Sequence, residues 1–401
     1  MALLLVAFAA VGCGGDEGSD TTATSDTTAT SAATGGGTSG DPVIIGFAAG
    51  MTGDAAAGDV PSLEGMEYTV KILNESGGIA GRPVELIVKD MKSDVALGAT
   101  VANQLIDEGA QILVGPAFPG YAAGIIQAAA AAGITVLGGT STQPEYTRIG
   151  GAKAYLVAFG DNVQAAATAE NALEQGYKTV YTLVSPDLSY TAMLPVFFKQ
   201  VFEKGGGKEI GTDNFTIGQP DFSAQVTKIA GLATQPDCIY IPMFPPDVTT
   251  FLTQLRAAGV TAAVYGPDGF DMQAMLDLAG PDAEGVLFST HGFPTPGSRV
   301  EEWVNGYTEW KGQAPESSAL GGLGCDCIYV VKAAVEAAGS SDPKAIGDAL
   351  ATLENVQVVT GVLTYKGTDG VPLKTVTIAT VKDGKFAFVE ERIPEYVPPA
   401  Q

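Results

Sequence analysis

Short apolar runs alternate with amphipathic stretches along most of the chain. The first run, Val43–Phe47, precedes a Gly- and Ala-rich loop, a helical pattern over Leu63–Asn74 and a second apolar run at Val84–Val88. Strand, loop, helix and strand in this order form the repeating unit of a parallel sheet that helices cover on both faces. The same series predicts further strands at 112–114 and 134–137, and helices at 96–108 and 121–132.

A second series of the same kind follows Gly160. It predicts strands at 180–184, 238–241, 263–265 and 285–289, and helices at 165–175, 192–204, 223–232, 248–258 and 272–278. The remaining pattern predicts helices at 299–312 and 319–338, strands at 361–365, 375–381 and 385–390, and a loose end at 394–400. The predicted fold class is therefore α/β, with two doubly wound parallel-sheet lobes.

The N-terminal region has a different character. Residues 1–12 are almost wholly apolar, but a helix of this length falls far short of a hydrocarbon core of about 30 Å, so they predict a signal peptide. Small residues precede Cys13, and this short pattern resembles the lipobox of bacterial lipoproteins. The resemblance implies that Cys13 is the lipidated residue. Residues 14–40 contain no large apolar residue and predict a flexible tether, so we interpret 13–40 as lipid anchor and linker.

Length and charge narrow the function classes. With 401 residues, 46% of them hydrophobic, the chain is long enough for two domains. The formal net charge of −24 would repel phosphate backbones, so nucleic acid is not an expected partner. The cysteines Cys238, Cys325 and Cys327 predict no disulfide framework, and their pairing stays open.

Motifs of common enzyme classes are absent from the sequence. The one histidine, His291, rules out HExxH and multi-histidine zinc sites, and we expect it in a loop near a lobe junction. The sequence has no G-x-S-x-G elbow, no phosphate loop and no G-x-G-x-x-G after the first strand. The segment Gly321–Cys327 offers too few metal ligands at awkward spacing, and it predicts a packed helix with small residues. We therefore expect no catalytic residue, metal or cofactor, and no enzyme.

Five stretches together resemble the type I periplasmic binding proteins of branched-chain amino-acid importers. The resemblance spans about Val43 to Val389, and the N-x-x-G-G-I-x-G-R pattern that begins at Asn74 is its most specific element. The stretches are Met51–Gly53, Leu73–Leu86, Asp221–Ser223, Gly266–Gly269 and Ala283–Gly285.

The resemblance implies a two-lobed arrangement with the ligand between the lobes. Three crossover segments join the lobes in that family, and they are expected near Phe159, His291 and Leu363. The N-terminal lobe would then comprise residues 41–159 and 291–363, and the C-terminal lobe 160–290 and 364–394.

Candidate contacts in the N-terminal lobe follow predicted strands, because parallel sheets bind ligands at the carboxyl ends of their strands. The resemblance implies contacts from Phe118, Gly120 and Tyr121. Relatives commonly place a serine where this chain has Pro119, which lacks an N–H, so the Gly120 and Tyr121 amides or the Tyr121 hydroxyl are the expected substitutes.

The loop after the next predicted strand contributes Thr140 and Thr142. The resemblance makes Thr142 a ligand contact through its amide and hydroxyl. The pattern Thr142-x-x-Glu145 also fits a capping box that starts a helix, and this alternative stays open.

Candidate contacts in the C-terminal lobe are Tyr190, Phe244 and Asp268. The resemblance implies that Asp268 pairs with the ammonium group of the ligand, a charge-assisted bond that gains strength in a closed cleft. Pro267-Asp268-Gly269 is equally typical of a simple turn, and Tyr190 and Phe244 are equally typical of core residues.

The expected function is that of an extracytoplasmic, lipid-anchored binding protein of an ABC importer, with a branched-chain or other hydrophobic amino acid as ligand. Its expected partners are that small molecule, the permease subunits and, through the lipid anchor, the membrane. An amide, a urea-like compound or a small carboxylate is the alternative ligand. A ligand-sensing subunit of a membrane receptor is the alternative role.

Overall fold

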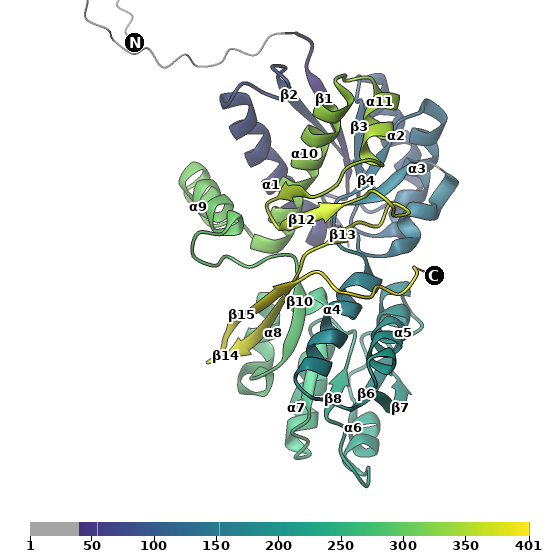
Figure 1. Cartoon of the computed structure of the whole chain (residues 1–401), viewed down its shortest axis with the longest axis vertical. Helices are drawn as coiled ribbons and strands as arrows, with labels where there is room; N and C mark the ends of the chain where they lie inside the picture. Colours follow the sequence, from purple (N-terminus) through teal and green to yellow (C-terminus); the bar gives the residue numbers. More distant parts are fainter. Residues whose placement is uncertain (1–39, 54, 152, 401) are drawn as a thin grey trace, which may run out of the picture. The chain divides into compact units, whose positions relative to one another are not determined.

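The computed structural model describes residues 40–53, 55–151 and 153–400 (Figure 1). The predicted signal peptide at 1–12, the predicted lipidation site Cys13 and nearly all of the predicted linker lie outside the described residues.

The first sheet consists of five parallel strands in the order β2-β1-β3-β4-β5. Its strands are β1 (Val43–Ala49), β2 (Val84–Asp90), β3 (Ile112–Gly115), β4 (Val136–Gly138) and β5 (Ala154–Leu156). Alternate side chains of β1 pack on opposite sides: Val43, Ile45 and Phe47 contribute to one core, and Ala48 to the other.

Helices cover both faces of this sheet. The helices of the first core are α1 (Ala56–Glu75), α10 (Ser318–Ala338) and α11 (Pro343–Leu350). Those of the second are α2 (Gly98–Asp107) and α3 (Pro119–Ala132). A further helix, α9 (Arg299–Lys311), packs on α1 and α10.

The second sheet has seven strands in the order β15-β14-β10-β9-β8-β6-β7, in which β14 pairs antiparallel with both β10 and β15 and the other pairs are parallel. Its strands are β6 (Thr179–Val184), β7 (Lys208–Asn214), β8 (Cys238–Tyr240), β9 (Ala263–Gly266), β10 (Leu287–Thr290), β14 (Val376–Lys382) and β15 (Lys385–Arg392). On one face lie α4 (Asp161–Glu174) and α5 (Ser189–Lys204); on the other lie α6 (Ser223–Ala230), α7 (Asp247–Ala257) and α8 (Gln273–Ala279). The α/β class with two parallel-sheet lobes is confirmed.

Three connections join the sheets, after β5, after β10 and before β14. The third differs from expectation, because Leu363 still belongs to a small sheet of β11 (Val356–Val358), β12 (Gly361–Thr364) and β13 (Leu373–Lys374). Tyr365, which we assigned to the C-terminal lobe, packs in the core below β1, and its hydroxyl donates to the Leu156 carbonyl oxygen at 2.6 Å. The chain enters the second sheet only at Val376, and the other lobe boundaries remain a prediction.

Some elements differ from the sequence-based expectation. Helix α1 begins at Ala56 rather than at Leu63, and Pro61 lies inside its second turn. Strands β5, β7, β11 and β13 and helix α11 were not expected. The segment 394–400 has no regular structure, but the prediction of a loose end is wrong, since the Glu395 and Tyr396 amides donate to Glu170 Oε1.

Helices α1 and α10 pack backbone against backbone. A Cβ atom at Gly65 would overlap the carbonyl oxygen of Gly321, and a Cβ atom at Gly324 would overlap that of Ser62. Among the described residues α10 alone is long and apolar enough to span a membrane, but 72% of its most apolar window is buried inside the protein. It is a core helix, as the small residues of Gly321–Cys327 predicted.

A fully buried ion pair lies next to the third connection. Lys374 Nζ donates to Asp326 Oδ2 at 2.8 Å and to the Val157 carbonyl oxygen at 2.9 Å, and neither charged side chain is exposed. Asp326 also accepts hydrogen bonds from the Val359 and Thr360 amides and from the Thr360 hydroxyl. The ion pair thus joins α10 to the first connection through Lys374 and to the loop between β11 and β12 through Asp326.

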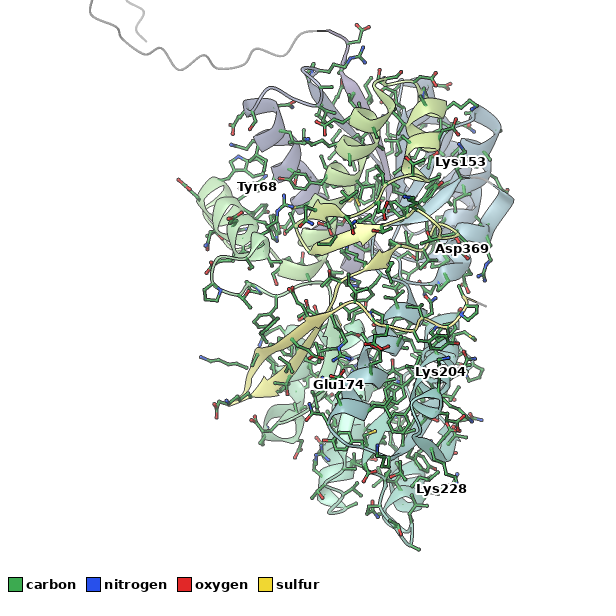
Figure 2. The ribbon with its side chains drawn as sticks, viewed as in Figure 1. Tyr68, Lys153, Glu174, Lys204, Lys228 and Asp369 are labelled. Atoms are coloured by element: carbon green, nitrogen blue, oxygen red, sulfur yellow. The ribbon has the colours of Figure 1, made fainter. Side chains whose placement is uncertain are left out.

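Most other ion pairs lie at the surface. Lys153 pairs with Asp348 and Lys228 with Asp213, and both lysines are labelled in Figure 2. Their side chains are 45% and 61% exposed, so water screens these pairs and they contribute little to stability.

We expect Lys374→Met to lower the free energy of unfolding by about 3–5 kcal/mol, because it leaves the buried Asp326 carboxylate without its cation. Chemical denaturation measures this change. The matched control is Lys366→Met, since Lys366 is 63% exposed and pairs with Glu354 at the surface. Similar denaturation midpoints for the two variants would show that the buried pair has no special role.

Candidate ligand-binding cleft

A cavity of about 180 Å³ opens where the ends of strands from both sheets meet. Its volume is below the roughly 300–1,000 Å³ of sites for drug-sized ligands, so it suits a small molecule. Of the residues expected to contact a ligand, those that line it are Phe118, Thr140, Thr142, Tyr190, Phe244 and Asp268.

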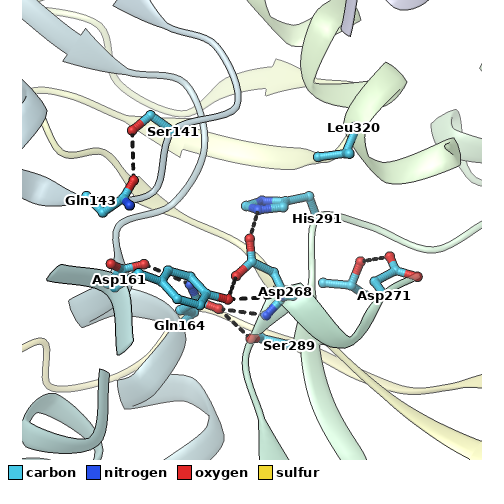
Figure 3. A network of polar contacts seen from close by, with 12 residues as sticks. Ser141, Gln143, Asp161, Gln164, Asp268, Asp271, Ser289, His291 and Leu320 are labelled. Atoms are coloured by element: carbon cyan, nitrogen blue, oxygen red, sulfur yellow. Dashed lines mark hydrogen bonds and ion pairs between the residues drawn. The ribbon is translucent and has the colours of Figure 1, made fainter. Parts of the chain in front are cut away.

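The Asp268 carboxylate is held by donors from two other elements (Figure 3). The Tyr190 hydroxyl, on α5, donates to Asp268 Oδ1 at 2.7 Å and accepts from the Gly269 amide at 3.0 Å. His291 Nε2 lies 3.0 Å from Asp268 Oδ2, directly after β10. Gln164, on α4, accepts from the Asp268 amide at 3.1 Å and from the Ser289 hydroxyl at 2.7 Å. Asp268 begins the 3-10 helix Asp268–Phe270, and its carboxylate lies at the cavity wall.

Burial raises the pKa of Asp268, but hydrogen bonds from His291, Tyr190 and Gln164, together with the positive charge that His291 can carry, more than offset this effect and lower the pKa. Burial lowers the pKa of His291 more than the nearby carboxylate raises it. An ionised carboxylate can only accept, so Nε2–H of His291 donates in this contact.

Two further carboxyl groups lie beside Asp268. Burial, with the charge of Asp268 as a second cause, raises the pKa of Asp161 well above its usual value. Asp161 hydrogen-bonds with the side chains of Thr142 and Gln164. Asp271 accepts a hydrogen bond from the Thr290 hydroxyl, and burial raises its pKa to about 6.

The capping-box alternative for Thr142 and Glu145 does not describe their contacts. Thr142 bonds to Asp161 on α4, and Glu145 Oε2 accepts from the Ser189 hydroxyl on α5 at 2.5 Å. Both contacts join the loop after β4 to helices of the second sheet.

Apolar side chains form the rest of the cavity wall. The rings of Tyr190 and Phe244 are stacked, with centroids 5.0 Å apart and an angle of 20° between their planes. Leu188 and Met272 also line the cavity and are 43% and 42% exposed. The first turns of α1 and α10 supply Ala57, Gly58, Ala319 and Leu320.

Gly120 and Tyr121 do not line this cavity. Helix α3 begins at Pro119, and this turns Gly120 to the surface and packs Tyr121 against the core below α2 and α3. The sequence analysis missed His291, Asp271 and Thr290 as cavity residues. His291 and Thr290 stand at the end of β10, so the strand-end rule that selected Asp268 after β9 would have found them.

The residues of this cleft do not form an evident metal site. In the part of the chain that the structure describes, no three His, Cys, Asp or Glu side chains converge in a way that would hold a metal ion. Cys238, Cys325 and Cys327 are buried free thiols.

Comparison with known proteins agrees with this architecture. The family model described as "Periplasmic binding protein" matches residues 42–385. The chain is 27% identical to the Leu/Ile/Val-binding protein homolog 3 of Brucella melitensis, over 87% of this chain and 94% of that protein. It is also similar to the solved leucine binding protein LivK of Thermotoga maritima, with a TM-score of 0.74, 28% identity, and coverage of 88% of this chain and 99% of that one.

A third similar protein is the branched-chain amino acid transporter substrate binding protein LivJ of Streptococcus pneumoniae, solved in complex with isoleucine. Its TM-score is 0.73 and its identity 25%, with coverage of 88% of this chain and all of that one. The chain belongs to the periplasmic binding protein family. It is an extracytoplasmic solute-binding protein and not an enzyme.

Asp59 positions one wall of the cleft. Its carboxylate accepts from the Gly50 amide at 2.7 Å and from the Ala117 amide at 2.9 Å, and Ala117 lines the cavity. Burial raises its pKa to about 7, and the two amide bonds only partly oppose this effect. Because the pKa of Asp59 is higher in the folded than in the unfolded chain, the folded state binds the proton more tightly. The contribution of Asp59 to stability is therefore full below about pH 4 and is lost as the pH rises through 7.

We expect Asp59→Asn to lower the free energy of unfolding by about 1–3 kcal/mol at pH 4, because the carboxamide nitrogen cannot accept from a backbone amide. The difference from the unmodified protein should shrink as the pH rises to 7.5, since Asn does not titrate. Urea denaturation at both pH values measures this, with the exposed Asp107→Asn as control. A difference that does not change with pH would contradict the assignment.

Proposed function

We propose that this protein is the substrate-binding lipoprotein of an ABC importer and that it binds a branched-chain or other hydrophobic amino acid in the interlobe cleft. The observation that carries the proposal is the Asp268 carboxylate, held by Tyr190 and His291 in a small cavity with apolar walls. An ammonium group is the natural partner of such a carboxylate.

The remaining parts of the ligand have matching surroundings. An aliphatic or aromatic side chain would pack against Phe118, Phe244 and Leu188, and Thr140 and Thr142 offer polar groups on the opposite lobe. The Brucella and Thermotoga relatives are named as Leu/Ile/Val- and leucine-binding proteins, and this supports the same ligand class here.

Ligand binding would favour closure of the two lobes. A ligand that touches Asp268 on one lobe and Thr142 on the other gains contacts in the closed form that the open form lacks. The closed form would then be recognised by the permease subunits.

A panel of ligands tests the proposal through thermal unfolding, because a ligand that binds only the folded state raises the midpoint. The panel comprises hydrophobic amino acids, acetamide, urea and small carboxylates. Stabilisation by hydrophobic amino acids is the expected result. Stabilisation only by amides, urea or carboxylates would replace the ligand class with the alternative one.

We expect Asp268→Asn to weaken binding of an ammonium-bearing ligand by more than about tenfold, because it removes the charge but keeps the size of the side chain. Isothermal titration calorimetry measures the affinity. Asp277→Asn is the control, since Asp277 is exposed on α8 and does not line the cavity. Equal affinities of both variants would remove Asp268 from the site.

Lipidation at Cys13 has its own test. The expected result of Cys13→Ser is that the protein moves from the membrane fraction to the soluble fraction and that the mass of a diacylglyceryl group disappears from the mature N-terminus. Retention of the variant in the membrane fraction would contradict the lipid anchor.

A further inference from the structure

Helix α5 has no negative charge of its own at its N-terminus. The side chain of its N-cap residue, Leu188, accepts no hydrogen bond, and no residue of its first turn is acidic. The first amide groups of a helix have no partner within the helix, and the helix dipole favours a negative charge beside them. A carboxylate from another part of the molecule would therefore stabilise this end of α5.

Glu145 supplies such a carboxylate from the first sheet. It lies in the 3-10 helix η2 (Pro144–Gly151), which follows β4, and its Oε2 accepts from the Ser189 hydroxyl at 2.5 Å. Ser189 is the first residue of α5, so the carboxylate lies at the N-terminal turn of this helix. Hydrogen bonds from a hydroxyl to a carboxylate are shorter and stronger than those between neutral groups. One such bond thus connects an element of the first sheet to a helix of the second.

Ser189 stands between two residues of the cavity wall, Leu188 and Tyr190. The Tyr190 hydroxyl donates to Asp268 and accepts from the Gly269 amide, so the position of the first turn of α5 affects how the Asp268 carboxylate is held. Glu145 and Ser189 are not among the described residues that line the cavity. A change at Glu145 would therefore reach the ligand through α5 and through the arrangement of the two lobes.

The loop after β4 makes a second contact with the other sheet, at a different place. The Asp161 amide donates to the Thr142 carbonyl oxygen at 2.8 Å, and Asp161 begins α4 just after the first connection. A contact so close to a hinge changes little when lobes rotate. Helix α5 follows β6, further from that connection along the chain, so the distance from Glu145 to Ser189 depends more on the angle between the lobes.

We propose that Glu145 is an interlobe latch: its hydrogen bond to Ser189 caps α5 when the lobes close and is lost when they open. Glu145 is then a positioning residue, which holds the turn that carries Tyr190 and favours the closed form for every ligand alike. The inference rests on the proposed function for the identity of the ligand, but the latch itself is a contact between two parts of the protein.

Glu145→Ala tests the latch without a ligand. Small-angle X-ray scattering of the purified full chain measures the radius of gyration, which grows as the lobes move apart. We expect a larger radius of gyration for the ligand-free variant than for the unmodified protein. Glu203→Ala is the control, since Glu203 is exposed near the other end of the same helix and should leave the radius unchanged. Equal radii for Glu145→Ala and the unmodified protein would overturn the inference, whatever the ligand is.

Ligand affinity is the second readout. Calorimetry with valine, leucine and phenylalanine should show that Glu145→Ala weakens the binding of each by the same factor, at least about fivefold, because Glu145 acts on closure and does not touch the ligand. A loss confined to one of the three ligands would overturn the latch. If none of the three binds to the unmodified protein, the proposed ligand class fails, and the scattering measurement alone decides whether the latch exists.

Variants of Ser189 identify the bond itself. Ser189→Ala removes the hydroxyl donor and should reproduce both effects of Glu145→Ala, whereas Ser189→Thr keeps a hydroxyl and should retain the affinity and the radius of gyration. The double variant Glu145→Ala with Ser189→Ala should bind no more weakly than either single variant, because both remove the same bond. Losses that add up in the double variant would show that the two side chains act independently and would overturn the latch.

Discussion

The buried pair of Lys374 and Asp326 is the constraint on which the arrangement of the two sheets depends. Charges removed from water are tolerated only when hydrogen bonds and opposite charges replace the lost hydration. Here the replacements come from backbone groups of the first connection and of the loop after β11, so these segments must lie in fixed positions around α10. Because Lys374 directly precedes the third connection, the same requirement fixes where the chain leaves for the second sheet.

The cleft follows from this arrangement. Parallel strands with helices on both faces leave their carboxyl ends open, and two such sheets facing each other place two sets of loops around one cavity. Within it, hydrogen bonds from three separate elements hold Asp268: those of Tyr190 and His291 to its carboxylate, and that of its own amide to Gln164. The position of the carboxylate therefore depends on how these elements pack.

The sequence was sufficient for elements and residues whose signal is local. Thr142, Tyr190 and Asp268 could be selected because each follows a hydrophobic run that predicts a strand. The family resemblance then aligned these residues with ligand-contacting positions of the family. Gly120 and Tyr121 were selected by the resemblance alone, and neither lines the cavity, because both lie in the first turn of α3, which begins at Pro119. The edge strand β7 was missed because it is largely polar. The contribution of α10 to the cavity was not foreseen either, since Ala319 and Leu320 reach it only through tertiary packing with α1.

The glycine contacts between α1 and α10 have a consequence for how the specificity of such a cleft could evolve. The first turns of both helices form part of the cavity wall, and the spacing of the two helices is set where Gly65 meets Gly321 and Gly324 meets Ser62. One added methyl group at Gly65 would push the helices apart and enlarge the pocket, although Gly65 itself does not line it. Glycines at the contact between α1 and α10 would therefore help to set the size of the ligand that fits, although they do not contact it. A comparison restricted to the residues of the cavity wall would not detect a substitution at these glycines.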